Sequence, residues 1–386
     1  MIYLDNAATS WPKPAGVAEA VVRALREPLG NPGRTHHRAA LDAASMVAAC
    51  REDLAELFHA PNPLRICFTA NTTDALHLAI KGALRPGDHA ICSAMEHNSV
   101  WRPLKALAEM GVELSVAEAG QTGFVHPENV RRLLRPNTRL VVMQHASNVT
   151  GTIQAIQEIG AIVRAHGALF LVDAAQSAGS LPIDVVSMSI DLLAFPGHKG
   201  LLGPQGTGGL YVGEGVELQL VREGGTGSES LNAEQPSFYP DRLESGTLNV
   251  PGIAGLDASV TYLLARGVSS VRKHETGLTV QLLRGLARIP GVTLYGPAVD
   301  TPRAAVVSFN LEGWECTALA EELERRAGIA SRPGIHCAGL AHRTLGTAAI
   351  GTVRLSPGPF TSPEEIETAL AVVEAIAREP RDLCPR

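Results

Sequence analysis

Short apolar runs alternate with longer amphipathic segments between about residues 38 and 213. The short runs consist mainly of aliphatic and β-branched residues, which is typical of strands buried on both faces of a mostly parallel sheet. The pattern therefore predicts an α/β domain. Its strands are expected over residues 65–69, 89–93, 139–144, 169–172 and 192–195, each followed at once by polar or glycine-rich residues.

The segments between these strands repeat apolar residues at helical spacing, as over 76–84 and 156–163, and are predicted to be helices with one buried face. Residues 224–240, rich in glycine, serine and proline, interrupt the alternation. A second, smaller α/β unit is predicted after them. Its last helix is expected to have Ser362 as N-cap, Pro363 at the first helical position and Glu365 in a capping box.

The composition of the 386 residues, with 45% apolar and 19% charged residues, is that of a folded globular protein. A net charge of −6 argues against a nucleic-acid-binding surface or a polybasic membrane anchor. No apolar run approaches the ~20 residues of a membrane-spanning helix, and the N-terminus lacks a signal-peptide pattern, so a cytoplasmic location is predicted. The six cysteines have neither metal-site nor disulfide-framework spacing, and no metal site is predicted.

Candidate chemistry lies just after the predicted strands. Because ligands of open α/β sheets bind beyond the carboxyl ends of the strands, side chains at these positions are expected to converge although they are distant in sequence. The set comprises Thr72, Thr73, His97, Asn148, Asp173, Gln176, His198 and Lys199.

Asp173 and Lys199 together point to pyridoxal phosphate. A carboxylate beside a buried strand needs a cationic partner, which a pyridinium nitrogen would supply, and a cleft lysine of lowered pKa can form a Schiff base. Thr72 and Thr73 open a predicted helix, where backbone amides and hydroxyls favour a phosphate. His97 could stack on the ring. Taken singly, each residue has a structural interpretation, such as a helix cap or a partner for an arginine, but the joint arrangement favours the cofactor.

The glycine-rich stretch Gly203–Gly209 has neither the spacing of a dinucleotide-binding fingerprint nor a following Walker lysine. It is predicted to be a tight turn behind Lys199 rather than a nucleotide-binding loop.

A second chemical element is the polar segment Ser331–Ala338, which carries Cys337. Neighbouring Arg332 and His336 would favour the thiolate, the form that attacks sulfur. Arg354, on the strand predicted to follow, could form a bidentate pair with a substrate carboxylate or a surface salt bridge.

With these residues in view, the chain resembles the class V (fold type I) pyridoxal-phosphate enzymes, and among them the cysteine desulfurases and selenocysteine lyases of the SUF-type group II. The resemblance runs nearly end to end. It rests on motifs at residues 3–9, 71–74, 96–98, 147–151, 172–176, 197–199, 244–247 and 332–338.

This resemblance implies a large cofactor-binding domain over residues 14–253, with a mostly parallel seven-stranded sheet. A smaller C-terminal α/β domain over 254–386, joined by the N-terminal segment 1–13, would carry the catalytic cysteine loop. It also implies a homodimer.

The family's catalytic and cofactor roles fall on residues already singled out. By resemblance, Lys199 would carry the cofactor, His97 would stack on its ring and Asp173 would pair with the ring nitrogen. Gln176 and Asn148 would contact the side of the phenolic oxygen.

By resemblance, the phosphate would be bound by Thr73 and His198, joined by Thr247 from the second subunit. Thr72, at the start of the same predicted helix, is also expected to bind the cofactor. The family often has a hydroxyl residue before Gly-His-Lys, where this chain has Pro196, so one phosphate ligand would be missing.

On the substrate side, Cys337 would take up the sulfur. Arg354 and Arg332 would bind the substrate, and the mouth of the site would be lined by Asn6, Ala8 and either His36 or His37, of which His37 is taken as the match.

The implied activity is removal of sulfur from L-cysteine, which gives L-alanine and a Cys337 persulfide for an acceptor protein or small thiol. Selenocysteine lyase, acting on L-selenocysteine, and C–S β-lyase remain as alternatives on the same cofactor, and an aminotransferase is a further one. A non-catalytic sulfur-carrier scaffold is the alternative from another class.

Overall fold

The computed structural model of the protein describes residues 1–33 and 37–379. Its largest sheet has seven strands, in which β8 runs antiparallel to both neighbours and all other adjacent pairs are parallel. The mostly parallel seven-stranded sheet is therefore confirmed. In spatial order the strands are β2 (Ile66–Thr69), β8 (Gly208–Val212), β7 (Leu192–Pro196), β6 (Leu169–Asp173), β5 (Thr138–Gln144), β3 (His89–Ser93) and β4 (Glu113–Ala117).

The five predicted strands of this domain correspond to β2, β3, β5, β6 and β7, whereas β4 and β8 were not predicted. The interpretation of Gly203–Gly209 as a turn is wrong at its end, because Gly208 and Gly209 open β8. A Cβ at Gly208 would lie 2.8 Å from the carbonyl oxygen of Phe195, so glycine permits the close approach of β8 to its neighbour.

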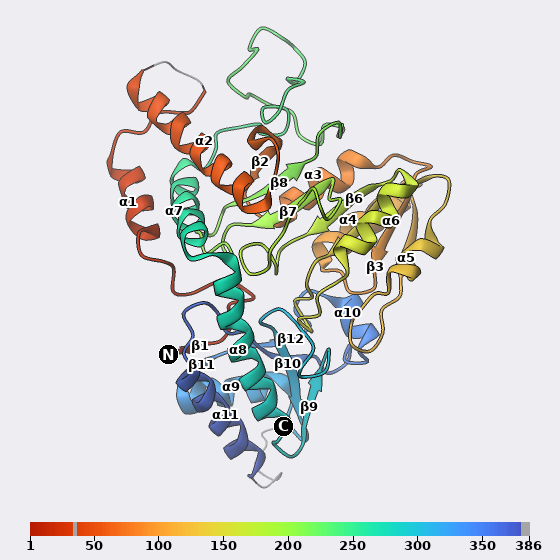
Figure 1. The fold of residues 1–386 in the computed structure, drawn as a ribbon, viewed down its shortest axis with the longest axis vertical. Helices are drawn as coiled ribbons and strands as arrows, with labels where there is room; N and C mark the ends of the chain where they lie inside the picture. Colours follow the sequence, from red (N-terminus) through yellow and green to blue (C-terminus); the bar gives the residue numbers. More distant parts are fainter. Residues whose placement is uncertain (34–36, 380–386) are drawn as a thin grey trace.

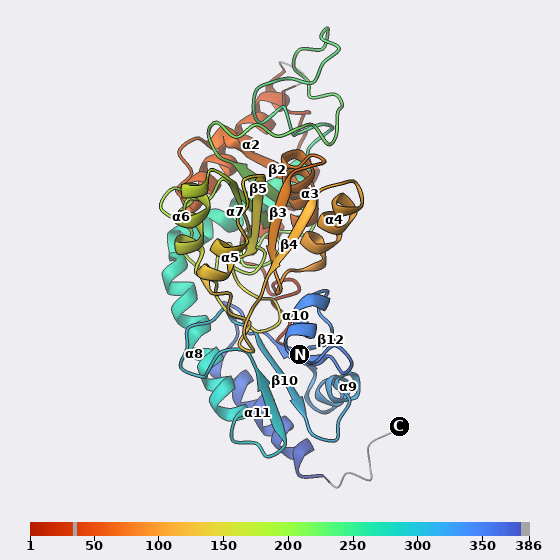
Figure 2. The ribbon, with the colours of Figure 1, turned by 90° about the vertical axis from the view of Figure 1, so that its right-hand side faces the viewer.

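Helices cover both faces of this sheet (Figures 1 and 2). Alternation along β5 shows why: Leu140 and Val142 face one core with α3 and α4, while Val141 and Met143 face the other with α2, α5, α6 and α7. The helices of this part are α1 (Val17–Arg26), α2 (Arg38–Phe58), α3 (Thr72–Ala83), α4 (Asn98–Glu109), α5 (Pro127–Leu133), α6 (Ile156–His166) and α7 (Val250–Arg266), with a 3₁₀ turn at Pro63–Arg65.

The smaller part contains an antiparallel sheet in the order β12 (Arg332–Gly334), β13 (Thr352–Leu355), β10 (Val307–Leu311) and β9 (Val292–Tyr295). It also contains α8 (Val268–Leu286), α9 (Cys316–Ala327), α10 (Gly339–Thr344) and α11 (Pro363–Ala377). The capping box of α11 is confirmed: the Ser362 hydroxyl accepts the Glu365 N–H and the Glu365 carboxylate accepts the Ser362 N–H.

The N-terminal segment contacts both parts: β1 (Ile2–Tyr3) pairs in parallel with β11 (Ile329–Ala330), and Thr9, Ser10 and Lys13 donate to the His198 carbonyl. Figures 1 and 2 show α8 running from the level of the large sheet down into the smaller part. The expected boundary after residue 253 falls within α7, which packs against α1 and α2.

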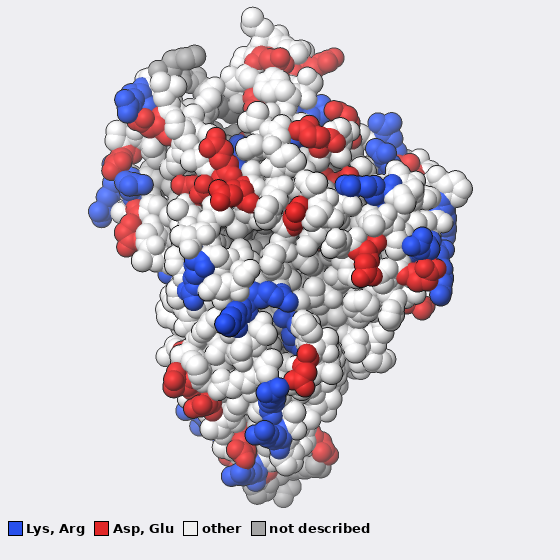
Figure 3. All heavy atoms as spheres, in the orientation of Figure 1, with Lys and Arg blue, Asp and Glu red and all other residues white. Residues whose placement is uncertain are grey.

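Charge on the face shown in Figure 3 is mixed, with acidic and basic side chains interspersed over both parts. Among the described residues, no helix is both long enough and apolar enough to cross a membrane.

Candidate active site

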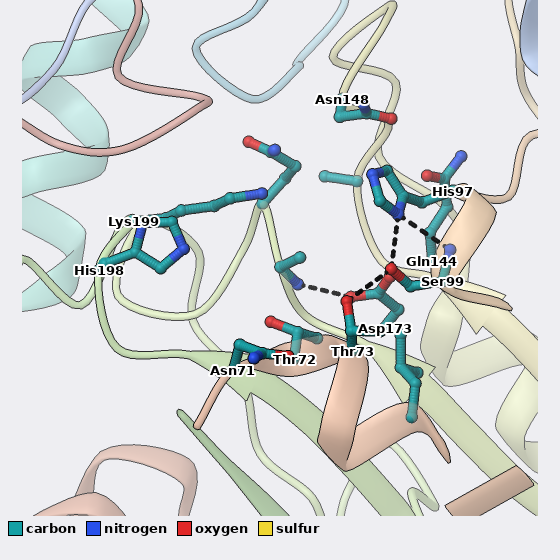
Figure 4. A pocket seen from close by; sticks show the side chains of 14 residues that line it. Asn71, Thr72, Thr73, His97, Ser99, Gln144, Asn148, Asp173, His198 and Lys199 are labelled. Carbon is teal, nitrogen blue, oxygen red and sulfur yellow. Dashed lines mark hydrogen bonds between the residues drawn. The ribbon is translucent and has the colours of Figure 1, made fainter. Parts of the chain in front are cut away.

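A cavity at the carboxyl ends of the central strands brings together eight of the predicted residues. Figure 4 shows Lys199 reaching into it from one side and His97 from the opposite side. The lining residues are Asn71, Thr72, Thr73, Leu76, His97, Ser99, Gln144, Ala146, Asn148, Asp173, Ala175, Gln176, His198 and Lys199.

Lys199 and Asp173 set the charge of this cavity. Asp173 ends β6 and is only 4% exposed; its Oδ1 accepts the Ala175 N–H at 2.9 Å. Burial raises the pKa of Asp173, against the effect of that hydrogen bond and of Lys199. Burial also lowers the pKa of Lys199 to about 8, although the Asp173 carboxylate acts in the opposite direction. An amine that gives up its proton this readily can act as a nucleophile near neutral pH.

The N-terminus of α3 lines the cavity. Asn71 caps the helix, its Oδ1 accepting the Asp74 N–H at 3.0 Å. The hydroxyl of Thr73 lies 2.8 Å from that of Ser99, which belongs to α4. Free amides and paired hydroxyls at a helix N-terminus suit an anionic group such as a phosphate.

His97 is the N-cap of α4 and is held in one tautomer. Its Nδ1 accepts the Ser99 N–H at 3.1 Å, so the proton of the neutral ring lies on Nε2. Burial, followed by the charge of Lys199, lowers the pKa of His97 to about 4. The ring is therefore neutral near pH 7.

Two buried polar atoms at the cavity have no hydrogen-bond partner within residues 1–33 and 37–379: Asn148 Oδ1 and His198 Nδ1. Because an unpartnered buried polar atom is costly, these atoms fit a cavity that receives a polar ligand.

The segment that carries Cys337 is hydrogen-bonded to the cavity residue Asn148 and to Asn98 at the start of α4. The Asn148 amide donates to the His336 carbonyl at 2.7 Å, and the Asn98 N–H donates to the Cys337 carbonyl at 2.8 Å. His336 and Cys337 both adopt left-handed backbone angles, with φ of 51° and 57°. The thiol is exposed, and Arg332 Nη2 donates to its Sγ at 3.6 Å.

His336 does not supply the positive charge expected of it. Its side chain is 2% exposed and shares a 2.9 Å hydrogen bond with Thr352 Oγ1. Burial, followed by the charge of Arg354, lowers the pKa of His336 to about 2, so the ring is neutral and cannot favour a thiolate through charge. That expectation is wrong for His336, and Arg332 is the charged neighbour of Cys337.

Arg354 is fully buried, which rules out the surface salt bridge. Its Nη2 donates to Asp5 Oδ1 at 2.8 Å and its Nη1 to the Asn148 carbonyl at 3.1 Å. Its Nε has no hydrogen-bond partner within the described ranges. Arg354 is thus held beside a cavity residue with a donor to spare.

The family model described as Aminotransferase class-V matches residues 2–369. The chain belongs to that family. A relative from Methanothermobacter thermautotrophicus named "Probable cysteine desulfurase" is 36% identical over 97% of this chain and 94% of its own length. One from Pectobacterium atrosepticum named "Cysteine desulfurase" is 33% identical over 98% and 93%.

Two solved structures are also similar to this chain. The apo cysteine desulfurase of Thermococcus onnurineus NA1 has a TM-score of 0.92 and 34% identity, covering 98% of this chain and 94% of that one. A cysteine desulfurase of Escherichia coli has a TM-score of 0.86 and 27% identity, covering 97% and 94%. The expected fold and the class V family are confirmed, whereas the SUF-type group II assignment stays a prediction.

Seven predicted site residues do not line this cavity: Cys337, Arg332 and Arg354, described above, and Asn6, Ala8, His37 and Thr247. Asn6 lines a neighbouring cavity that shares Lys199 and Gln176, and its amide donates to the Tyr3 and Ser356 carbonyls. Ala8 lines neither of these two cavities.

His37 also lines neither of them; it caps α2, where its Nδ1 accepts the Ala40 N–H at 3.3 Å. Its alternative, His36, lies outside the described residues. Thr247 is exposed and lines a separate cavity with Thr207 and Asn249.

Sequence reasoning missed Ser99, Gln144 and Asp5. Ser99 lies two residues after His97 and Gln144 ends β5, so position next to a predicted strand end could have found both. Asp5 pairs with Arg354 from 349 residues away, and no local pattern indicates that contact.

Proposed function

We propose that this chain is a pyridoxal-phosphate-dependent cysteine desulfurase, which converts L-cysteine to L-alanine and leaves the sulfur as a persulfide on Cys337. The proposal rests mainly on one contact, between the cavity that contains Lys199 and the loop that carries Cys337. Asn148 lines the cavity that contains Lys199, and through the His336 carbonyl it also holds the loop of the exposed Cys337 thiol. An amine and a thiol at one site are the two groups that this reaction needs.

The cavity fits the cofactor. Lys199 offers the amine, Asp173 a carboxylate for a cationic ring nitrogen and His97 a flat ring for stacking. Asn148 and Gln176 would contact the phenolic oxygen side. The N-terminus of α3, with Thr72 and Thr73, and His198 would bind the phosphate.

The Ser99 hydroxyl, 2.8 Å from that of Thr73, would supply the phosphate ligand that Pro196 cannot. When bound, pyridoxal phosphate withdraws electrons from the substrate Cα and so makes its proton acidic.

Substrate binding and proton transfer are assigned to residues of the chain. Arg354, oriented by Asp5, would bind the substrate carboxylate with its unpartnered Nε–H, and Arg332 would add charge at the mouth. Asn6, Ala8 and His37 are proposed only for the outer entrance. Lys199, whose pKa is lowered to about 8, takes up the substrate Cα proton.

Sulfur transfer is a displacement at the substrate sulfur. Cys337 Sγ bonds to that sulfur while the substrate Cβ–S bond breaks, and the electron pair remains on Cβ. A proton taken up by Cβ then completes the methyl group of alanine. In the net reaction the Cys337 thiol proton ends on carbon, carbon gains two electrons and each sulfur loses one. An acceptor thiol, of a protein or a small molecule, then removes the terminal sulfur.

A homodimer is part of the proposal. Thr247 lies away from the Lys199 cavity and is exposed, which is compatible with service in the site of a second copy.

The test is product analysis of cofactor-loaded protein given L-cysteine and a thiol reductant. Alanine and sulfide are expected in equal amounts, and Cys337→Ala is expected to lose both. Because Cys337 lies outside the cofactor cavity, the variant should bind pyridoxal phosphate normally. Pyruvate in place of alanine would replace the proposal with β-elimination, and full turnover by the variant would remove Cys337 from the reaction. The same assay with L-selenocysteine measures the sulfur-to-selenium preference.

A further inference from the structure

The carbonyl of His198, one peptide before Lys199, is surrounded by donors from the N-terminal segment. Ser10 donates to it through its N–H at 3.0 Å and its hydroxyl at 3.1 Å, and the Thr9 hydroxyl lies at 3.2 Å. The Lys13 ammonium adds a fourth contact at 3.1 Å and also donates to Ser10 Oγ at 2.8 Å. A carbonyl oxygen has two lone pairs, so this acceptor has more donors than it needs.

Lys13 is therefore not required to satisfy the carbonyl. Without it, three donors would remain on the same oxygen. Burial lowers the pKa of Lys13 to about 8, which means that the folded protein disfavours its charge. A methionine of similar length would avoid that penalty, and the apo protein that carries it is expected to be at least as stable as the wild type.

The segment that carries Lys13 also reaches the proposed substrate site. Asp5 binds Arg354, and β1 pairs with β11 in the smaller part. One short segment thus contacts the arginine proposed for the substrate carboxylate at one end and the Lys199 peptide at the other.

We propose that Lys13 is a positioning residue, whose ammonium fixes the peptide between His198 and Lys199 so that the Lys199 amine faces the cofactor aldehyde and the substrate Cα. The inference rests on the proposed function for its role in turnover. Its effect on the attachment of the cofactor to Lys199 does not depend on which reaction follows.

The proposed role of the Lys13 ammonium predicts a specific dependence on pH. The titratable group beside it is the His198 imidazole, whose pKa is lowered by burial and then by the charges of Lys199 and Lys13. The Thr9 and Ser10 hydroxyls of its own segment share the same carbonyl and do not titrate. As the pH rises through the Lys13 pKa, the charge-assisted hydrogen bonds to the carbonyl weaken. The ratio of the wild-type rate to the rate of a variant without the amine, for cofactor attachment and for kcat/KM, should then become smaller.

The experiment compares Lys13→Met and Lys13→Arg with the wild-type protein, and uses Lys105→Met, which removes an exposed lysine on α4, as control. Three quantities are measured: the Tm of the apo protein, the rate at which added pyridoxal phosphate attaches to Lys199 as seen by absorbance, and kcat/KM for L-cysteine. Each rate is taken one pH unit below and one above the Lys13 pKa.

At the lower pH, Lys13→Met is expected to slow cofactor attachment and lower kcat/KM by roughly tenfold, the effect of one charged hydrogen bond. Its apo Tm should equal or exceed that of the wild type, and the tenfold ratio should shrink at the higher pH. Lys13→Arg, which keeps the charge, should restore both rates in part, and Lys105→Met should change nothing.

The inference is overturned if Lys13→Met attaches cofactor at the wild-type rate, if its rates fall only as its Tm falls, or if the ratio is independent of pH. A wild-type protein that forms neither alanine nor sulfide would refute the proposed function alone. Slower cofactor attachment in Lys13→Met would then still support the role of Lys13.

Discussion

Three buried histidines, His145, His336 and His342, are at most 4% exposed, and burial lowers the pKa of each well below 6.5. In the unfolded chain these rings take up protons near pH 6.5, whereas in the folded protein they do so near pH 4 or below. The unfolded state therefore binds more protons below pH 6.5. Folding stability is fully present above that pH and is lost as the pH falls.

Through this linkage the three histidines contribute a decrease in the free energy of unfolding of the apo protein between pH 6.5 and pH 4, of up to about 1.4 kcal/mol per pH unit each. The buried Glu96 and Glu275, whose pKa values burial raises to about 8, contribute in the opposite direction. His342→Asn, which can keep the hydrogen bond to Thr347 Oγ1 without a titrating ring, should reduce that slope by up to one proton. Urea unfolding at a series of pH values measures both slopes. An identical slope in the variant would show that His342 titrates alike in both states.

Between elements, a buried ion pair joins α2 to the loop that carries Thr247. Arg51 Nη1 and Nη2 donate to the two carboxylate oxygens of Glu244 at 2.8 and 3.0 Å, and the Phe68 N–H of β2 donates to Glu244 Oε1 at 2.6 Å. Both charged side chains are under 10% exposed. Glu244 thus fixes the start of the Glu244–Thr247 motif against the sheet.

Glu244→Gln is expected to lower the free energy of unfolding by about 3 kcal/mol, because it leaves the buried Arg51 charge without its carboxylate. Asp42→Asn serves as control, since the Arg38–Asp42 pair is exposed and contributes little. Chemical denaturation of the two variants beside the wild type gives the comparison. If both variants lose the same small amount, the buried pair does not anchor the loop.

Over the whole molecule, the sequence was sufficient to predict the site residues that lie at or near the ends of strands. Asp173 ends β6, His97 and Lys199 come within four residues of the ends of β3 and β7, and apolar patterning located those strand ends. Contacts between remote segments were not predictable: Asp5 meets Arg354, and Lys13 meets the His198 carbonyl, only after the N-terminal segment has packed between the two parts. Such contacts depend on tertiary geometry, which hydrophobic periodicity does not contain.

The proposed homodimer can be tested by combining two inactive variants in one dimer. If Thr247 serves the site of the partner, Lys199→Ala and Thr247→Ala should each be impaired as pure proteins. A mixed dimer, however, contains one complete site, with Lys199 from the Thr247→Ala copy and Thr247 from the Lys199→Ala copy. Unfolding and refolding the two variants together should therefore restore sulfide release from L-cysteine above the sum of the separate proteins. If Thr247 served its own subunit, no site in any mixture would be complete, and the mixed sample would show only the sum.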